Sequence, residues 1–233
     1  MPTLTYEERR GEVETYFDRT AAVAWARLTS TAPVGRIRAT VRAGREAMRR
    51  TLLSWLPADL SGKRLLDAGC GTGALAVEAA RRGARVVAID LSPTLIALAR
   101  ERLPADLRAG SIEFRAGDLL DPALGRFDHV VAMDSLIHYR AADTIRVLAA
   151  LAARTDASLL FTFAPRTPAL AVMHAVGRLF PRGDRAPAIE PVGETTLRQR
   201  IAAERDLERF GPQRTERIAS GFYTSQALEL ARR

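Results

Sequence analysis

A glycine-rich turn between a short apolar strand and a helix constrains the fold of this chain most. Residues 63–68 read Lys-Arg-Leu-Leu-Asp-Ala, and a helix-forming run follows the turn from Ala74 to Arg81. Alternate glycines let the backbone turn sharply and approach a ligand closely, because glycine has no Cβ. In α/β folds a strand, a tight turn and a helix N-terminus in this order bind nucleotide-like ligands. The pattern predicts such a site at Gly69, Cys70, Gly71, Thr72 and Gly73.

The acid that precedes this turn narrows the class of ligand. A dinucleotide would place its pyrophosphate against the turn, where the carboxylate of Asp67 would repel it. S-adenosylmethionine brings a cationic sulfonium and an ammonium instead, and both suit that carboxylate. A second acid, Asp90, ends the apolar run 85–90 and can accept hydrogen bonds from both ribose hydroxyls. These acids predict a methyltransferase that uses S-adenosylmethionine.

Three further segments complete the expected cofactor site. Leu91 and Ser92 follow the second acid, and Ser92 is also the better N-cap for the next helix. After a strand at 112–115 come Gly117, Asp118 and Leu119, where the aspartate can accept the adenine amino group and the leucine can pack on the ring. A strand at 127–133 ends at Met133, beside the expected position of the sulfonium.

The composition limits the class of protein. A chain of 233 residues with 47% apolar residues fits one large α/β domain, and no run approaches the roughly 18 apolar residues of a membrane span. The single cysteine, Cys70, suits a reducing cytoplasm. The net charge of +8 comes from arginines spread along the chain, with Lys63 the one lysine. We therefore expect a cytoplasmic protein without a nucleic-acid partner, and peripheral contact with a membrane stays open.

The order of expected elements predicts two parts. Residues 1–57 form a helical arm or lid, with two helices separated at Pro33, and residues 58–233 form the cofactor-binding core. Strand and helix patterns alternate in the core, which favours a parallel sheet covered on both faces. The strands are expected at 64–68, 85–90, 112–115, 127–133, 157–163, 214–220 and 226–232, and the helices at 73–82, 92–103, 141–153 and 194–204. A proline-rich insertion at about 165–200, with an apolar helix from Ala169 to Phe180, is expected to bind substrate.

The loop after the fourth strand is the expected acceptor site. It reads Asp-Ser-Leu-Ile-His-Tyr from Asp134 to Tyr139 and lacks the Asn/Asp-Pro-Pro-aromatic pattern of enzymes that methylate base nitrogens. His138 is the histidine expected near the methyl group. His129 lies inside a strand and His174 inside the insertion helix, so we expect both to be structural.

Taken in order, the four cofactor segments resemble the class I, Rossmann-like methyltransferases over about residues 63–163. That resemblance implies a seven-stranded sheet whose last strand is antiparallel. Segments 15–20, 134–139 and 217–228, together with Trp25, resemble one subfamily, the magnesium-protoporphyrin O-methyltransferases of chlorophyll and bacteriochlorophyll synthesis. The resemblance implies methyl transfer from S-adenosylmethionine to one propionate of magnesium protoporphyrin IX. It also implies contact with the large subunit of magnesium chelatase, which supplies the substrate. Peripheral association with the photosynthetic membrane stays open.

The same resemblance implies a catalytic tyrosine at Tyr16. His138 either orients the reacting carboxylate or ligates the magnesium of the substrate, and no metal bound by the protein itself is expected. Arg166, Arg178 or Arg182 could hold the second propionate. An O-methyltransferase acting on a quinone precursor or another phenol remains the alternative enzyme. A porphyrin carrier without chemistry would not need the adenosine site, and a nucleic-acid-modifying enzyme ranks third.

Overall fold

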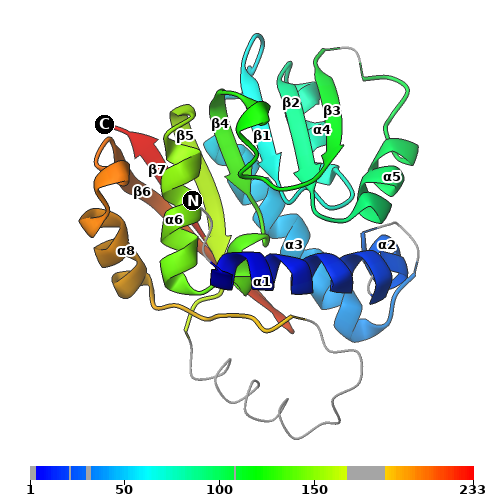
Figure 1. Cartoon of the computed structure of the whole chain (residues 1–233). Helices are drawn as coiled ribbons and strands as arrows, with labels where there is room; N and C mark the ends of the chain where they lie inside the picture. Colours follow the sequence, from blue (N-terminus) through cyan, green and yellow to red (C-terminus); the bar gives the residue numbers. More distant parts are fainter. Residues whose placement is uncertain (1–3, 21, 30–32, 108, 167–186) are drawn as a thin grey trace, which may run out of the picture.

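The computed structural model describes residues 4–20, 22–29, 33–107, 109–166 and 187–233. Its centre is a seven-stranded sheet with the order β3-β2-β1-β4-β5-β7-β6 (Figure 1). The strands are β1 (Arg64–Ala68), β2 (Arg85–Asp90), β3 (Ser111–Ala116), β4 (Phe127–Ala132), β5 (Thr155–Phe163), β6 (Phe210–Ser220) and β7 (Tyr223–Arg232).

The strand directions confirm the predicted sheet. Strands β1 to β5 pair in parallel, β7 runs antiparallel to β5, and β6 runs antiparallel to β7. The order of the parallel strands reverses at β1, which lies between β2 and β4. Ligands of open α/β sheets bind at the carboxyl ends of the strands next to such a reversal. The fold therefore places the expected site at the carboxyl ends of β1 and β4.

Helices cover both faces of the sheet because both faces are apolar. The fully buried Leu65 and Leu66 are neighbours in β1 and belong to separate hydrophobic clusters. Helices α3, α4 and α5 contribute to the cluster of Leu65, and α6 and α8 contribute to that of Leu66. The α-helices of the core are α4 (Ala74–Arg81), α5 (Pro93–Glu101), α6 (Ala141–Ala152) and α8 (Glu194–Ala203), and the 3-10 turns are η2 (Pro122–Leu124), η3 (Leu136–His138) and η4 (Arg205–Leu207).

The N-terminal region has more elements than the sequence predicted. Helix α1 (Leu4–Thr15) is followed by a π-helix, η1 (Tyr16–Thr20), then α2 (Ala22–Leu28) and α3 (Arg36–Trp55). The prediction of one helix before Pro33 was therefore wrong. Asp18 in η1 accepts hydrogen bonds from Ser92 Oγ (3.0 Å) and Thr94 N (3.1 Å) at the start of α5. This contact joins segments far apart in the chain, which local periodicity does not reveal.

Helix α1 crosses the carboxyl ends of the strands, and α3 lies behind it (Figure 1). The closing strands β6 and β7 begin earlier than predicted, since Phe210 already pairs with Arg232. Pro212 is accommodated there because β6 is an edge strand. The predicted insertion helix, with His174 and Arg178, and Arg182 after it lie outside the described residues.

Candidate active site

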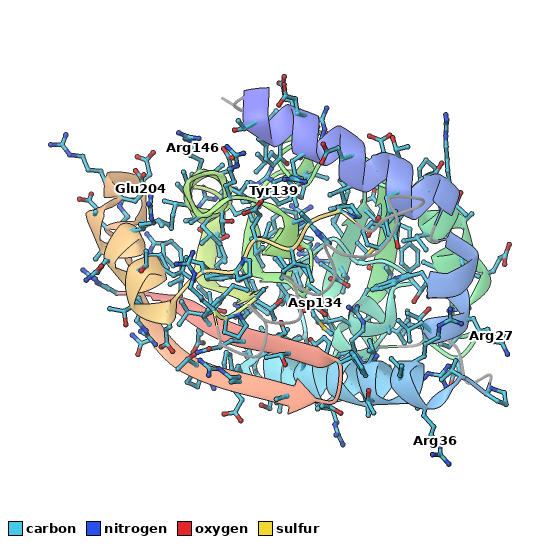
Figure 2. All side chains as sticks on the ribbon, turned by 90° about the horizontal axis from the view of Figure 1, so that it is seen from below. Arg27, Arg36, Asp134, Tyr139, Arg146 and Glu204 are labelled. Carbon is cyan, nitrogen blue, oxygen red and sulfur yellow. The ribbon has the colours of Figure 1, made fainter. Side chains whose placement is uncertain are left out.

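A cavity of about 420 Å³ lies at the carboxyl edge of the sheet, between the core and the N-terminal helices. Ten of the predicted site residues line it: Tyr16, Gly69, Gly71, Asp90, Leu91, Gly117, Asp118, Leu119, Met133 and His138. The other five predicted residues are adjacent in sequence but do not line it: Asp67, Cys70, Thr72, Gly73 and Ser92. Figure 2 views this face from below, with Asp134 near its centre.

The glycine turn forms one wall of this cavity. Gly69 has a φ of +83°, a conformation that favours glycine, and a Cβ at this position would lie 2.3 Å from Cβ of Ser135. The loops after β1 and β4 therefore approach each other too closely for a side chain at Gly69. Burial raises the pKa of the Cys70 thiol well above its ordinary value, so this cysteine is protonated within the turn.

Asp67 carries a buried carboxylate beside the turn. Its side chain accepts a hydrogen bond from the backbone N–H of Ala76, while Oδ2 has no hydrogen-bond partner in the described part of the chain. Burial, reinforced by the nearby Asp90, raises the pKa of Asp67 to about 7. An unpaired buried oxygen of this kind would be stabilised by a cation.

Asp90 organises the turn from the end of β2. Its Oδ2 accepts a hydrogen bond from Gly71 N (2.8 Å), and its Oδ1 accepts one from Ser92 N (3.0 Å). Burial raises its pKa. Ser92 caps α5 by accepting a hydrogen bond from Leu95 N (3.2 Å), as predicted. Lone pairs on the Asp90 carboxylate remain available to hydroxyl donors in the cavity.

Asp118 is held by the N-terminal arm. Its carboxylate accepts hydrogen bonds from Tyr6 Oη (2.8 Å) and Leu120 N (2.9 Å), and it pairs with Arg10 at 2.6 Å. The Tyr6 ring stacks on Tyr139, with centroids 5.0 Å apart. Helix α1 is therefore tied to the loop that was predicted to meet adenine, a contact that the sequence analysis missed.

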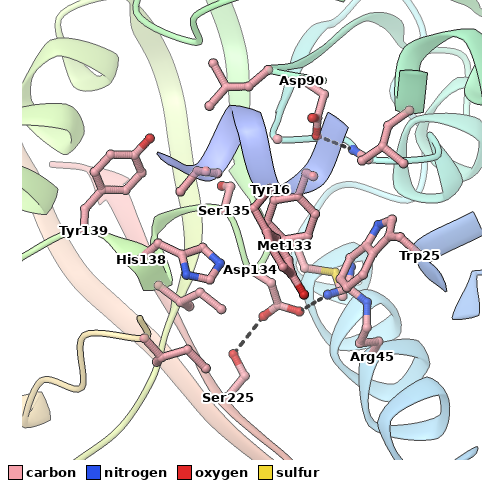
Figure 3. A pocket seen from close by; sticks show the side chains of 18 of the residues that line it. Tyr16, Trp25, Arg45, Asp90, Met133, Asp134, Ser135, His138, Tyr139 and Ser225 are labelled. Carbon is pink, nitrogen blue, oxygen red and sulfur yellow. Dashed lines mark hydrogen bonds and ion pairs between the residues drawn. The ribbon is translucent and has the colours of Figure 1, made fainter. Parts of the chain in front are cut away.

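The opposite end of the cavity is organised by Asp134. This residue has a φ of +55°, and its nearly buried carboxylate pairs with Arg45 of α3 at 2.6 Å. It also accepts hydrogen bonds from Tyr223 (3.1 Å) and Ser225 (3.0 Å) of β7. The Arg45 guanidinium lies 4.5 Å from the centroid of the Trp25 ring. Figure 3 shows Arg45 and Ser225 reaching Asp134 from different sides, with His138 and Tyr16 nearby.

His138 lies in η3 and is buried. Its Nδ1 lies 3.3 Å from the carbonyl oxygen of Ala188. A carbonyl oxygen can only accept, so Nδ1 carries the proton in this hydrogen bond and the neutral ring keeps a lone pair on Nε2. Burial lowers the pKa of His138, which favours this neutral form.

His129 has the structural role predicted for it. Buried within β4, it makes a 2.8 Å hydrogen bond through Nδ1 to Ser158 Oγ of β5. Arg166, predicted as one candidate for the second propionate, does not line the cavity.

Comparison with known proteins identifies the family. The chain is 52% identical over 230 residues to a magnesium-protoporphyrin O-methyltransferase of Rhodobacter capsulatus, which covers 98% of this chain and 99% of that protein. The chain belongs to the magnesium-protoporphyrin O-methyltransferase family. A family profile described as the magnesium-protoporphyrin IX methyltransferase C-terminus matches residues 132–232, and a methyltransferase domain profile matches 65–156. The family predicted from the sequence is confirmed.

Solved structures give the same assignment. A crystal structure of magnesium protoporphyrin IX methyltransferase from Synechocystis PCC 6803 with bound SAH has a TM-score of 0.83 and 29% identity, covering 95% of this chain and 98% of that one. A ubiquinone biosynthesis O-methyltransferase of Xanthomonas oryzae is 38% identical over 135 residues, but this covers only 54% of this chain and 55% of that protein. Similarity to the magnesium-protoporphyrin family thus extends through the arm and the closing strands, whereas the other similarity spans about half of each chain.

In the ranges given above, none of the helices combines the length and apolar character needed to span a membrane. Within those same ranges, no group of three or more His, Cys, Asp or Glu side chains is placed to hold a metal ion.

Proposed function

We propose that this chain transfers the methyl group of S-adenosylmethionine to a propionate carboxylate of magnesium protoporphyrin IX, giving the monomethyl ester. The observation that carries the proposal is one continuous cavity, in a member of this family, that joins the glycine turn and Asp90 to His138 and Tyr16. A cofactor bound at the glycine turn and Asp90 would present its methyl group toward His138 and Tyr16.

The residues present fit S-adenosylmethionine, which supplies an electrophilic methyl group on a positively charged sulfur. Asp67 offers a buried carboxylate oxygen that has no partner among the described residues, and Asp90 faces the cavity where ribose hydroxyls would donate. A carboxylate has about four acceptor sites. Asp118 uses three of them on Tyr6, Arg10 and Leu120, which leaves one for an adenine amino group. The remaining cofactor contacts are assigned to the sequence-predicted set: Gly69, Cys70, Gly71, Thr72, Gly73, Leu91, Ser92, Gly117, Leu119 and Met133.

The acceptor chemistry needs position more than base strength. A propionate has a pKa of about 4–5 and is ionised at neutral pH, so it attacks without a general base. Holding such a carboxylate in line with a methyl group can contribute up to about 7–11 kcal/mol in ideal cases. Because an anion and a cation combine, exclusion of water favours the step. Phe17, Trp25 and Leu28 of the arm supply apolar walls for this purpose.

We assign Tyr16 and His138 to the acceptor. The phenol of Tyr16 can donate a hydrogen bond to the reacting propionate, as the family resemblance implies. Neutral His138, with its Nδ1 proton on Ala188, has no second proton to donate to a carboxylate. Its Nε2 lone pair instead suits ligation of the substrate magnesium, so this geometry favours that role of the two considered.

The family resemblance supports two further parts of the proposal. One is a contact with the large subunit of magnesium chelatase, which would supply the substrate. The other is a cytoplasmic enzyme with peripheral attachment to the photosynthetic membrane. Co-purification with that subunit and sedimentation with anionic lipid vesicles test them separately.

The assay is direct. The purified chain is incubated with S-adenosylmethionine labelled in its methyl group and with magnesium protoporphyrin IX, and ester formation is followed by chromatography. A phenolic quinone precursor serves as the comparison acceptor. Label in the porphyrin monoester is expected. Transfer to the phenol without any transfer to the porphyrin would establish the alternative O-methyltransferase instead.

A further inference from the structure

The cationic side chains of the cavity differ in how they are engaged. Among the described residues, the arginines that line it are Arg38 and Arg45, both from α3. Arg45 pairs with Asp134 at 2.6 Å and lies over the Trp25 ring. Arg38 has no ion pair with an acid in the part of the chain that is described. Its charge is therefore available to an anion in the cavity.

The helical period places Arg38 at the outer end of the cavity. Arg38, Val41 and Arg45 all line it, and their spacing of three and four residues puts them on one face of α3. Arg38 lies about 10 Å along the helix axis from Arg45, at about 1.5 Å per residue. Because Arg38 is exposed whereas Arg45 is half-buried, Arg38 stands at the mouth.

An aromatic side chain stands at the same mouth. Phe222, in the turn between β6 and β7, lines the cavity although it is 59% exposed. The turn is held against the first part of α3, since a Cβ on Gly221 (φ +56°) would lie 2.5 Å from Thr40 Oγ1. Phe222 is thereby fixed at the end of α3 that carries Arg38. A large apolar side chain and a guanidinium without an ion pair among the described residues therefore face one opening.

We propose that Arg38 and Phe222 form the acceptor-recognition site, in which Arg38 binds the propionate that is not methylated and Phe222 packs on the macrocycle. This inference rests on the proposed function. The reacting carboxylate must keep a lone pair free, so a guanidinium that gripped it would weaken its attack. Asp134 neutralises Arg45 close to His138, and Arg38 supplies a cation farther out. One carboxylate is thus anchored while the other stays reactive.

The test compares two variants on two acceptors. Arg38→Gln removes the charge at the mouth, and Arg36→Gln removes the same charge from an exposed position that does not line the cavity and points away from it (Figure 2). The acceptors are magnesium protoporphyrin IX and a magnesium porphyrin that bears a single propionate. Arg38→Gln is expected to lower kcat/KM for magnesium protoporphyrin IX about five- to tenfold, through a higher KM, and to leave kcat/KM for the porphyrin with a single propionate unchanged. Arg36→Gln is expected to leave both unchanged.

The aromatic part has its own variant. Phe222→Ala is expected to raise KM for both acceptors, because both carry the macrocycle. Equal losses of Arg38→Gln on the two acceptors, no loss on either, or an equal loss in Arg36→Gln would overturn the assignment of Arg38. Porphyrin affinity is measured separately from catalysis, by titrating each protein with magnesium protoporphyrin IX and following the shift of its Soret band. Absence of ester with either porphyrin would therefore refute the proposed function, whereas equal porphyrin affinity of Arg38→Gln and the unsubstituted protein would refute this inference.

Discussion

Replacing Asp67 by asparagine is expected to stabilise the protein above pH 7 and to weaken its hold on a cationic methyl donor. The carboxylate is 2% exposed, and burial raises its pKa from 3.8 to about 7. Since a pKa change of one corresponds to about 1.4 kcal/mol, the charged form costs the folded protein about 4 kcal/mol. Asparagine has nearly the same shape and no charge, so Asp67→Asn avoids this cost.

The sign of the pH dependence follows from proton binding. Between pH 4 and pH 7 the unfolded chain has released the Asp67 proton that the folded protein retains, so stability falls as pH rises. Relative to Asp67→Asn, the unsubstituted protein is expected to lose about 1.4 kcal/mol per pH unit between pH 5 and pH 7 and then to level off. Urea denaturation of both proteins at pH 5, 6, 7 and 8 measures the difference. Asp106→Asn, at an exposed acid, is the control, and its difference should stay within about 0.5 kcal/mol throughout.

Donor binding should show the complementary behaviour. A cation beside Asp67 favours the ionised form, so affinity for S-adenosylmethionine is expected to rise about fivefold from pH 6 to pH 7, to reach about tenfold by pH 8 and to level above that. In Asp67→Asn the affinity should be lower and lack this rise, which isothermal titration calorimetry measures directly. A stability difference that stays constant from pH 5 to pH 8, or unchanged donor affinity in Asp67→Asn, would refute the reasoning.

Three further substitutions test other parts of the structure. Gly69→Ala places a Cβ 2.3 Å from Cβ of Ser135 and should lower the free energy of unfolding by more than about 2 kcal/mol. Gly62→Ala is the control, because Gly62 also has a positive φ but a Cβ there would meet none of the described atoms within 4 Å. It should cost about 1–2 kcal/mol in the same denaturation assay. His138→Gln should lower turnover at least about tenfold and spare donor affinity. In the unsubstituted protein at saturating S-adenosylmethionine, where the pH dependence of donor affinity does not limit the rate, the lowered pKa of His138 should preserve kcat down to pH 6.5 and place the acid loss below it, as a pH–rate profile can show. Tyr6→Phe removes the hydroxyl that donates to Asp118 at 2.8 Å, and faster hydrogen exchange across α1, with a loss of about 1 kcal/mol, is expected.

The strands and the turn expected to form the cofactor half of the site could be predicted because their signals are local. Strands β1 and β2 have the predicted bounds, since each is an apolar run that ends at a polar or glycine-rich boundary. Ser92 could be predicted as a cap from its position before Pro93. Such features need only a few neighbouring residues, and the acids at the strand ends share one edge of a parallel sheet.

The acceptor half depends on contacts between distant segments. Arg45 and Asp134 are 89 positions apart, and in the sequence Arg45 is one of several arginines in a helical run. The positive φ of Asp134 also leaves no sequence signature, because most residues at that angle are glycines. Only the folded chain shows that Arg45 is neutralised and that Arg38 is not paired in the same way. The arginines predicted to hold the second propionate are all at or near the insertion, and nothing in the sequence there indicates which face of α3 lines the cavity.

Asp118, which the sequence predicts as an acceptor for the adenine amino group, has further partners in the structure. Its carboxylate was predicted from the strand end alone, yet Tyr6 and Arg10 reach it from α1, more than 100 positions away. Arg10 neutralises the charge that would attract the adenine amino group, and Tyr6 occupies one of the acceptor sites. Docking of α1 and the proposed binding of adenine would therefore draw on one carboxylate, and each would reduce what the other gains. Under the proposed assignment, α1 does more than cover the cavity, because its attachment would also set how strongly the adenine end is held.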